Sequence, residues 1–347
     1  MSGGVDSSVA ASLVCEKAGG EPVWGVTLTM GLGGSDEQNA ADAASVAARL
    51  GIGHVVSDCS ERFRRDVVDY FARTYREGMT PNPCVMCNRD IKFGFLAEEA
   101  DRLGLWYIAT GHYASTGMLN GRTVIRKAKD VTKDQSYMLA MLTKEQTARV
   151  CFPLGAYTKP EVRELAAARG FVTAGKHDSQ DICFVPDGDY AGFLSRVCGI
   201  EPVPGNYLDK EGKILGTHRG QLCYTVGQRK GLGISMGRHV FVLSKDAEAN
   251  TVVLGDEADL FRTRVSVTGF NVQAADGIGD LDGVRFAVKL RYSQRESEAL
   301  VHVTGADSLT LEFTEPQRAP SPGQFAVLYS GDILVGGGAV SMETTGA

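Results

Sequence analysis

Residues 2–8 read Ser2-Gly3-Gly4-Val5-Asp6-Ser7-Ser8, directly before a segment whose pattern predicts an amphipathic helix from Ser8 to Ala18. A glycine turn in this position presents backbone N–H groups at the positive end of a helix, which is an anion site. The alternative is an ordinary turn in which Ser7 caps the helix, and spacing alone favours neither. The stretch is not a Walker loop, because it lacks the Gly-Lys-Ser/Thr whose lysine grips terminal phosphates.

Helical and strand-like segments alternate outward from this loop to about Tyr113. Helices are expected at residues 8–18, 37–50, 61–75 and 91–103, and buried strands at 23–30, 54–56 and 106–109. This alternation predicts an open α/β domain with a parallel sheet wrapped by helices. A further helix should begin at a capping box from Thr158 to Glu161 and end at Gly170.

The composition changes at Glu201-Pro202-Val203-Pro204-Gly205, after which short strand-like runs are separated by Gly, Asp and Asn turns. We therefore expect an α/β domain over 1–200, a β-rich middle domain over 201–260, and a terminal domain over 261–347. The regularly spaced strands of the terminal domain predict a small β-barrel.

The composition limits the cellular setting and the type of partner. With 347 residues, 43% of them hydrophobic, the chain is long enough for two or three folded domains. No apolar run approaches the ~20 residues of a bilayer span, and no basic-then-apolar leader is visible, so we expect a cytoplasmic protein without a membrane partner. Eight cysteines fit a reducing compartment in which some thiols do chemistry. A net charge of −6 argues against general coating of nucleic acid.

Two segments carry cysteines that could react. Residues 80–88 read Thr-Pro-Asn-Pro-Cys-Val-Met-Cys-Asn, which puts Cys84 and Cys87 in C-x-x-C spacing at the start of a helix, where a thiolate is favoured. A zinc half-site or two buried thiols would give the same spacing. Residues 178–184 read Asp-Ser-Gln-Asp-Ile-Cys-Phe, in which Cys183 on its own would more often be a core thiol.

Residues 2–8 resemble the pyrophosphate loop of the ATP pyrophosphatases. Together with the motifs at 80–88, 109–113, 133–137, 179–184, 224–233, 291–292 and 322–324, they occur in the order found in the bacterial tRNA-uridine 2-sulfurtransferases, so that the resemblance covers essentially the whole chain. One departure concerns the start. In that superfamily a buried strand precedes the loop, whereas Met1 already belongs to it here, so we expect a longer natural chain or an incomplete sheet.

The resemblance implies an ATP-pyrophosphatase domain, a tRNA-binding middle domain and a C-terminal barrel. It implies that ATP, with Mg²⁺, binds at the first loop and at two strand ends, on Met1, Ser2, Gly3, Gly4, Val5, Asp6, Ser7, Met30 and Gly111. Without the resemblance, we would expect Met30 to pack in the core and Gly111 to form a tight turn. In the family, the uracil C2 oxygen of the wobble uridine attacks the α-phosphate of ATP, and sulfur then displaces AMP.

The resemblance also assigns the sulfur chemistry and the tRNA contacts. Cys183 resembles the carrier of a persulfide from a sulfur-donor protein, and Cys87 resembles the nucleophile that frees its terminal sulfur, leaving a Cys87–Cys183 disulfide. The implied tRNA contacts are Asn82, Pro83, Cys84, Val85, Met86, Asn88, His112, Lys133, Asp134, Gln135, Arg291, Tyr292 and Gln324. Without the resemblance, most of these would be ordinary solvated side chains.

Cys84 departs from the family, in which many members carry an aspartate at this position. Cys84, Cys87 and Cys183 could together ligate an iron–sulfur cluster that holds the transferred sulfur, with zinc as a weaker contender, or Cys84 could be a neutral variant. Two other functional classes fit these motifs less well. An ATP pyrophosphatase of another branch would need no paired cysteines, and a non-catalytic RNA-binding protein would need neither Asp6 nor the thiols.

Overall fold

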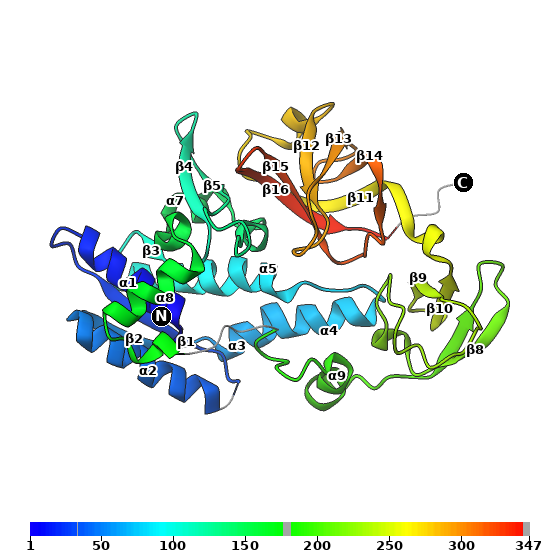
Figure 1. Cartoon of the computed structure of the whole chain (residues 1–347), viewed down its shortest axis with the longest axis horizontal. Helices are drawn as coiled ribbons and strands as arrows, with labels where there is room; N and C mark the ends of the chain where they lie inside the picture. Colours follow the sequence, from blue (N-terminus) through cyan, green and yellow to red (C-terminus); the bar gives the residue numbers. More distant parts are fainter. Residues whose placement is uncertain (33, 176–181, 343–347) are drawn as a thin grey trace. The chain divides into compact units, whose positions relative to one another are not determined.

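The protein is described by a computed structural model that covers residues 1–32, 34–175 and 182–342 (Figure 1). Residues 178–181 of the Cys183 motif therefore lie outside the described part. The chain forms two compact units: the first comprises 1–67, 84–180 and 330–335, and the second 68–83, 181–329 and 336–347. None of the described helices is long and apolar enough to cross a bilayer.

The predicted parallel strands are present in the first unit, but as two separate pairs. β1 (Trp24–Thr29) pairs in parallel with β2 (Gly53–Asp58), and β3 (Ile108–Ala109) pairs in parallel with β6 (Val150–Cys151). A Cβ on Gly53 would lie 2.6 Å from the Trp24 ring, so a glycine is needed where that indole covers the neighbouring strand. The prediction of an α/β domain is confirmed, whereas the single open sheet is replaced by two two-stranded sheets.

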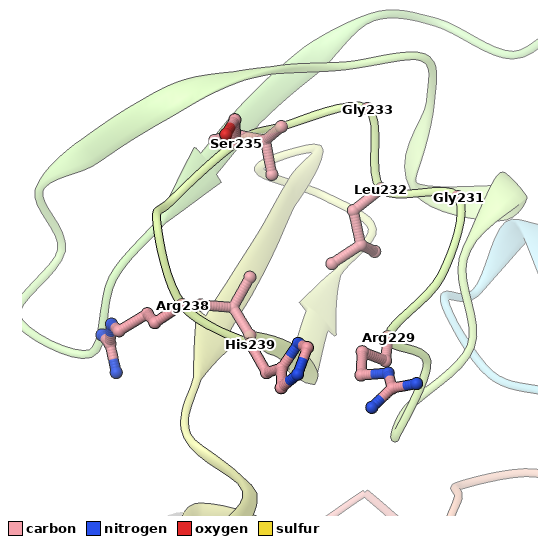
Figure 2. Close-up of a pocket in the computed structure, with 9 residues that line it drawn as sticks. Arg229, Gly231, Leu232, Gly233, Ser235, Arg238 and His239 are labelled. Carbon is pink, nitrogen blue, oxygen red and sulfur yellow. The ribbon is translucent and has the colours of Figure 1, made fainter.

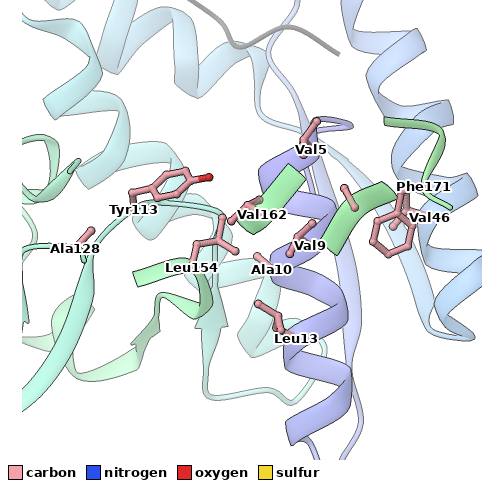
Figure 3. Close-up of a cluster of buried hydrophobic side chains, with 11 residues drawn as sticks. Val5, Val9, Ala10, Leu13, Val46, Tyr113, Ala128, Leu154, Val162 and Phe171 are labelled. Atoms are coloured by element: carbon pink, nitrogen blue, oxygen red, sulfur yellow. The ribbon is translucent and has the colours of Figure 1, made fainter. Parts of the chain in front are cut away.

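Three helices enclose the core of this unit (Figure 3). α1 (Val5–Lys17) packs against α2 (Gly34–Leu50) and α8 (Lys159–Ala168) through a shared apolar cluster that includes Val9, Leu13, Val46, Leu154, Val162 and Phe171. α8 begins with the predicted capping box, in which the Thr158 N–H donates to Glu161 Oε2 at 2.6 Å. The core thus fixes the start of α1, which carries the glycine loop.

Two predicted helices are longer and less regular than expected. The first is α3 (Ser60–Phe63), a π-helix (Arg64–Val68) and α4 (Asp69–Arg76) in succession. The second begins at Pro83 instead of Ile91, and consists of α5 (Pro83–Cys87), a π-helix (Asn88–Phe95) and α6 (Leu96–Arg102). Because π-turns are common at functional sites, the one that follows Cys87 directly marks a region of interest.

Only the second half of the strand predicted at 106–109 forms. Trp106 and Tyr107 are 59% and 71% exposed, and only Ile108 and Ala109 pair as β3. Arg149 explains the difference, because its Nε donates to the Trp106 carbonyl at 2.8 Å and its guanidinium lies 4.7 Å from the indole centroid. The aromatic run is therefore a surface contact and not part of a buried strand.

Several short elements of the first unit were not predicted. A hairpin of β4 (Ser115–Leu119) and β5 (Arg122–Arg126) pairs with the start of β16 (Ile333–Val340) through Arg126 and Ile333. The remaining helices are 3-10 turns at Ser136–Leu139, Pro153–Ala156 and Val172–Gly175, and α7 (Lys144–Arg149). The hairpin could not be foreseen, because its partner strand lies more than two hundred residues later.

The second unit contains the predicted β-rich part. α9 (Tyr190–Cys198) precedes a four-stranded sheet in the order β8 (Ile214–His218), β7 (Gly205–Leu208), β10 (Thr251–Gly255), β9 (Phe241–Asp246). Short 3-10 turns lie at Gln221–Cys223, Glu257–Leu260 and Ile278–Leu281. Two buried tyrosines, Tyr207 and Tyr224, form the centre of the core with Val242, Val252 and Leu254.

The terminal strands close into the predicted barrel. They are β11 (Phe261–Val272), β12 (Arg285–Lys289), β13 (Ser297–Val303), β14 (Leu309–Arg318), β15 (Phe325–Ser330) and β16 (Ile333–Val340), in the order β11-β14-β13-β12-β15-β16. β11 also pairs with β16, which closes the ring. A Cβ on Gly336 would lie 2.2 Å from the Asn271 carbonyl, so this closure requires a glycine.

Candidate functional site

The glycine loop leads into a helix whose N-cap residue is itself a glycine. α1 begins at Val5, its N-cap is Gly4, and Ser7 lies inside the helix, so the alternative that Ser7 caps it is wrong. The Ser7 and Ser8 hydroxyls instead donate backward to the Gly4 carbonyl at 3.1 and 2.8 Å. The N-cap residue therefore offers no capping side chain at the positive end of α1, which suits an anion site.

Glycines let other backbone segments approach this loop closely. Gly3 has φ +63°, and a Cβ there would lie 2.4 Å from the Asn39 carbonyl oxygen of α2. A Cβ on Gly111, beyond β3, would lie 2.8 Å from Asp6 C and from Ser7 N. The structure therefore brings the predicted Gly111 against the predicted loop. Closely packed glycine backbone at the N-terminus of a helix is suited to bind the phosphates of a nucleotide.

Asp6 is held by two residues that sequence reasoning missed. Lys159 Nζ lies 2.8 and 2.9 Å from the two carboxylate oxygens, and the Tyr113 hydroxyl donates to Oδ1 at 3.0 Å. The Lys159 ammonium also lies 5.7 Å from the Tyr113 ring centroid. The separation of 153 residues between Asp6 and Lys159 left no local signal for this pair.

Met30 and Met1 both lie beside β1. The N–H groups of Met30, Gly31 and Leu32 all donate to Asp36 Oδ2, at 2.9, 2.9 and 3.2 Å, so one carboxylate shapes the turn after the strand. The Met1 amino group donates to the Val26 carbonyl, and burial lowers the pKa of this amino group to about 6.

The C-x-x-C segment forms the first turns of a helix. Val85 is fully buried, Cys87 is buried, and Cys84 and Met86 are half-buried. Asn88 Nδ2 donates to the Met138 carbonyl at 2.9 Å, whereas Asn88 Oδ1 is buried and has no hydrogen-bond partner among the described residues. An unpaired buried acceptor beside Cys87 is costly unless a ligand uses it.

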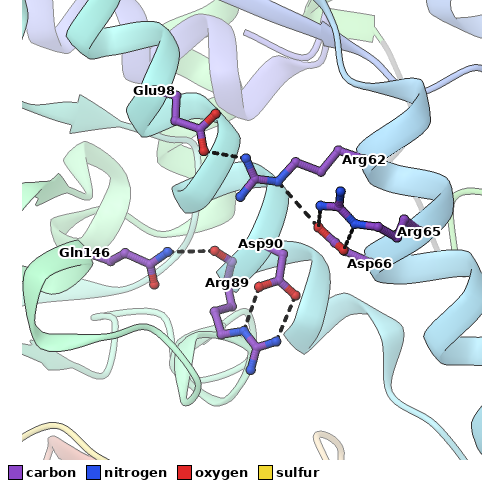
Figure 4. Close-up of polar contacts among 7 residues, drawn as sticks. All are labelled: Arg62, Arg65, Asp66, Arg89, Asp90, Glu98 and Gln146. Carbon is purple, nitrogen blue, oxygen red and sulfur yellow. Dashed lines mark hydrogen bonds and ion pairs between the residues drawn. The ribbon is translucent and has the colours of Figure 1, made fainter.

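Polar contacts brace this helix from both sides (Figure 4). Arg62, from α3, reaches Glu98 on α6 and lies 3.4 Å from Asp66. On the opposite flank, Gln146 Nε2 donates to the Arg89 carbonyl at 2.7 Å. The π-helix after Cys87 is thereby held between α3 and α7.

The predicted tRNA contacts of the first unit support its backbone. Gln135 exchanges hydrogen bonds with Tyr113, as its Oε1 accepts from Tyr113 N at 2.9 Å and its N–H donates to Tyr113 O at 2.7 Å. Asp134 is buried and accepts from Ala128 N and the Ser136 hydroxyl. Lys133 is half-buried.

His112 precedes Tyr113, and its Nδ1 lies 2.8 Å from Thr110 Oγ1. Burial, and secondarily the charge of Lys92, hold the pKa of His112 well below its usual value. The ring is therefore neutral at physiological pH.

The second unit holds the other predicted contacts. Gln324 Nε2 donates to the Thr80 and Pro81 carbonyls at 3.1 and 3.2 Å, which fixes the chain leading to the half-buried Asn82 and the buried Pro83. Arg291 Nη2 donates to the Ala319 and Val226 carbonyls at 2.7 and 3.3 Å, and the neighbouring Tyr292 is exposed.

Cys183 is exposed, but the next residue is anchored. Phe184 is buried, with its ring centroid 5.3 Å from that of Phe71 and 5.2 Å from that of Phe193. Phe71 belongs to α4 and Phe193 to α9, and both helices lie within the second unit. The aromatic cluster thus holds one side of the thiol-bearing segment while Cys183 itself stays accessible.

Metal ligands do not gather in the described parts of the chain. Across residues 1–32, 34–175 and 182–342, no three His, Cys, Asp or Glu side chains are close enough together to hold a metal ion. Cys84 is half-buried, Cys87 is buried and Cys183 is exposed. The iron–sulfur hypothesis therefore finds no support in this arrangement.

An open pocket of about 480 Å³ lies in the β-rich part of the second unit (Figure 2). Arg229, Gly231, Leu232, Arg238 and His239 are among its lining residues. Arg238 also forms an ion pair with Asp256. The pocket presents cationic side chains on glycine-rich backbone, a combination that suits phosphate groups.

Comparisons with known proteins agree with this architecture. Residues 1–187 match the tRNA methyl transferase HUP domain model, 191–256 the tRNA methyl transferase PRC-barrel domain model, and 268–340 the aminomethyltransferase beta-barrel domain model. The tRNA-specific 2-thiouridylases MnmA of Moorella thermoacetica and Lachnoclostridium phytofermentans are 45% and 43% identical, each over 98% of both chains. That of Treponema denticola is 41% identical over 100% of this chain and 98% of its own. This chain belongs to the tRNA-specific 2-thiouridylase family.

Proposed function

We propose that this chain catalyses the ATP-dependent 2-thiolation of the wobble uridine of tRNA. The observation that carries the proposal is the identity of 41–45% over nearly the whole length of proteins named tRNA-specific 2-thiouridylases. The start of α1 and the C-x-x-C helix supply sites for the nucleotide and the thiol that such a reaction needs.

The first step is activation of the base. ATP lies on the loop of Met1–Ser7, beside Met30 and Gly111, and Asp6 helps to place Mg²⁺ at the phosphates. The uracil C2 oxygen attacks the α-phosphate, and pyrophosphate leaves. The cradle around Gly3 and Gly111, which an added Cβ would fill, supports this placement.

The base must leave the anticodon stack to reach the nucleotide. The segment of Asn82, Pro83, Cys84, Val85, Met86 and Asn88 borders the flipped uridine. Asn88 Oδ1 supports this assignment, because it is a buried acceptor without a partner among the described residues and uracil N3 carries a donor. Val85 contributes packing beneath the base, since it is fully buried.

The second step delivers sulfur. Cys183 carries a persulfide received from a sulfur-donor protein, and its exposure supports access by that protein. The Cys87 thiolate attacks Cys183 Sγ, a Cys87–Cys183 disulfide forms, and hydrosulfide is released. Hydrosulfide adds to C2 of the adenylated base, and AMP departs with the C2 oxygen. An external thiol reductant then restores both cysteines.

The remaining assignments concern domains and tRNA contacts. We divide the chain at 1–200, 201–260 and 261–347, and assign tRNA binding to the middle domain, where the pocket of Arg229 and His239 is a candidate phosphate contact. His112, Lys133, Asp134, Gln135, Arg291, Tyr292 and Gln324 complete the tRNA surface, either directly or by shaping the backbone. Thiol chemistry of this kind requires a reducing compartment, so we place the reaction in the cytoplasm.

The experiment is mass spectrometry of tRNA nucleosides after incubation with ATP and a persulfide donor. The proposal expects 2-thiouridine only when both are present, from protein free of iron. Thiolation that requires stoichiometric iron and inorganic sulfide, and is lost in Cys84→Ala, would instead revive the iron–sulfur cluster. Absence of both 2-thiouridine and AMP with cognate tRNA would favour a non-catalytic RNA-binding role.

A further inference from the structure

The C-x-x-C helix contains a thiol to which the proposed mechanism gives no chemistry. Cys84 and Cys87 are three residues apart, and only Cys87 reacts in the sulfur-transfer step. Both belong to α5, and Cys87 has helical φ and ψ of −58° and −39° where the π-helix follows. Residues three apart on a helix lie on the same face, with their Cβ atoms about 5–6 Å apart. The two thiols are therefore neighbours on one helical turn.

The two thiols differ in exposure. Cys87 is 6% exposed, whereas Cys84 is half-buried. A disulfide that includes Cys87 therefore has one sulfur atom that is shielded from an external protein, although a side chain of the same turn can reach it. Thiol–disulfide exchange depends on which sulfur atom the attacking thiolate can approach. Cys84 is in a position to attack Cys87 from within the helix.

We infer that Cys84 is the resolving cysteine of the sulfur-transfer cycle. The inference rests on the proposed function, because it starts from the Cys87–Cys183 disulfide that remains when hydrosulfide is released. The Cys84 thiol loses its proton to solvent, and the thiolate attacks Cys87 Sγ. The bond between Cys87 and Cys183 breaks, a bond between Cys84 and Cys87 forms, and Cys183 leaves as a thiolate. The exchange itself involves no net oxidation or reduction.

This exchange prepares the protein for the next turnover. It releases Cys183, the exposed carrier of the persulfide, and moves the disulfide to a pair that includes the half-buried Cys84. A protein dithiol then reduces that pair with two electrons, which replace the two that the persulfide sulfur took up when it became hydrosulfide. A disulfide needs Cβ atoms about 3.5–4.5 Å apart, so the helical turn must tighten and the strained bond is readily reduced. Such a bond suits a step in a cycle better than a permanent cross-link.

The alternative roles of Cys84 predict different products. If Cys84 is a bystander, the wild type stops at the Cys87–Cys183 disulfide until an external reductant acts. If Cys84 ligates an iron–sulfur cluster, thiolation needs iron and leaves no disulfide. If Cys84 resolves the disulfide, the new bond lies within the C-x-x-C segment and Cys183 is a thiol again.

The test is disulfide mapping after a single turnover. Iron-free full chain is charged with a small-molecule persulfide under anaerobic conditions and freed of the donor. It is then mixed with ATP and unthiolated tRNA without reductant, quenched in acid and alkylated. Trypsin gives peptide 77–89, which holds Cys84 and Cys87, and peptide 177–196, which holds Cys183. For each 2-thiouridine formed, the wild type should contain about one disulfide within peptide 77–89 and an alkylated Cys183.

Cys84→Ser is the diagnostic variant, because a hydroxyl keeps the size of the side chain but does not attack a disulfide. It should join peptide 77–89 to peptide 177–196, with about one cross-link for each 2-thiouridine that it forms. This ratio does not depend on how fast the variant binds the base. Cys151→Ser is the matched control, because Cys151 is exposed and has no assigned role, and it should give the wild-type map. Cys183→Ser should give no disulfide within peptide 77–89, which separates exchange from air oxidation.

The outcomes distinguish this inference from the proposed function. A wild type that forms 2-thiouridine but accumulates the cross-link between the two peptides would overturn the inference and leave the proposed function intact. Formation of 2-thiouridine without any disulfide would overturn both the persulfide route and the inference. A wild type that forms no 2-thiouridine would refute the proposed function, and the inference with it. The wild-type map alone decides the claim if Cys84→Ser does not fold.

Discussion

At the scale of single residues, Asp6 is the side chain on which the proposed nucleotide site most depends. It pairs with Lys159 and accepts from Tyr113, so alanine at this position would leave a buried cation unpaired. Asp6→Asn is the cleaner variant, because an amide keeps the shape and can accept from Tyr113. We expect it to fold and to lower AMP release at least about a hundredfold, as removal of a preorganised charge does. AMP release at the wild-type rate would show that Asp6 is only structural.

In the proposed mechanism, Cys87 and Cys183 act in sulfur delivery and not in activation of the base. Cys183→Ser should release pyrophosphate with cognate tRNA at the normal rate in a single turnover but form no 2-thiouridine, because adenylation needs no thiol. Cys151→Ala serves as the matched control, because Cys151 is an exposed cysteine with no assigned role, and it should thiolate normally with a persulfide donor. Thiolated tRNA from Cys183→Ser, measured by nucleoside mass spectrometry, would exclude the persulfide role.

Lys245 gives the second unit a pH-dependent stability. Burial lowers the pKa of Lys245 from 10.5 to about 8, although its ammonium donates to the Tyr224 carbonyl at 2.8 Å. Between pH 8 and 10.5 the unfolded chain binds a proton at Lys245 that the folded chain does not, so the contribution of Lys245 to the unfolding free energy should rise with pH by roughly 3 kcal/mol and stay level below pH 8. Chemical denaturation of wild type and Lys245→Met across this window tests the claim, since the variant should lack that rise. Parallel pH profiles would contradict it.

At the scale of elements, the turn after β3 positions the loop before α1. A Cβ on Gly111 would lie 2.8 Å from two backbone atoms of Asp6 and Ser7, and backbone cannot yield as a flexible side chain does. Gly111→Ala should therefore weaken ATP binding at least tenfold and cost about 1–3 kcal/mol of stability. Gly279→Ala is the control, because its Cβ would meet nothing within 4 Å. Equal ATP affinities in the two variants would show that Gly111 does not support the site.

Local signals explain which elements the sequence could predict. The glycine loop, the capping box at Thr158 and the strands β1 and β2 are visible because their residues are neighbours in the chain. The contact of Lys159 with Asp6 and the pairing of Arg126 with Ile333 depend on distant segments and have no local pattern. Trp106 misled the strand prediction, because an exposed indole stacked on Arg149 has the same sequence pattern as a buried one.

At the scale of the whole molecule, motif order was more informative than any single motif. C-x-x-C and a glycine turn are each ambiguous, and the net charge of −6 argues against general nucleic-acid binding. The ordered motifs pointed to a tRNA-modifying family, to which the full-length relatives also belong. The negative net charge is compatible with membership of this family, because a folded RNA can be recognised by its shape and by a few cationic contacts.

In the proposed mechanism, the uracil C2 oxygen is activated on ATP before sulfur replaces it. The most direct measurement uses an anticodon stem–loop whose wobble uridine carries ¹⁸O at C2, with ATP, a persulfide donor and the full chain. Mass spectrometry of both products should find 2-thiouridine in the RNA and the ¹⁸O in the phosphate of AMP, in equal amounts. Thiolated RNA with unlabelled AMP, or AMP without any thiolated RNA from the wild type, would contradict the account.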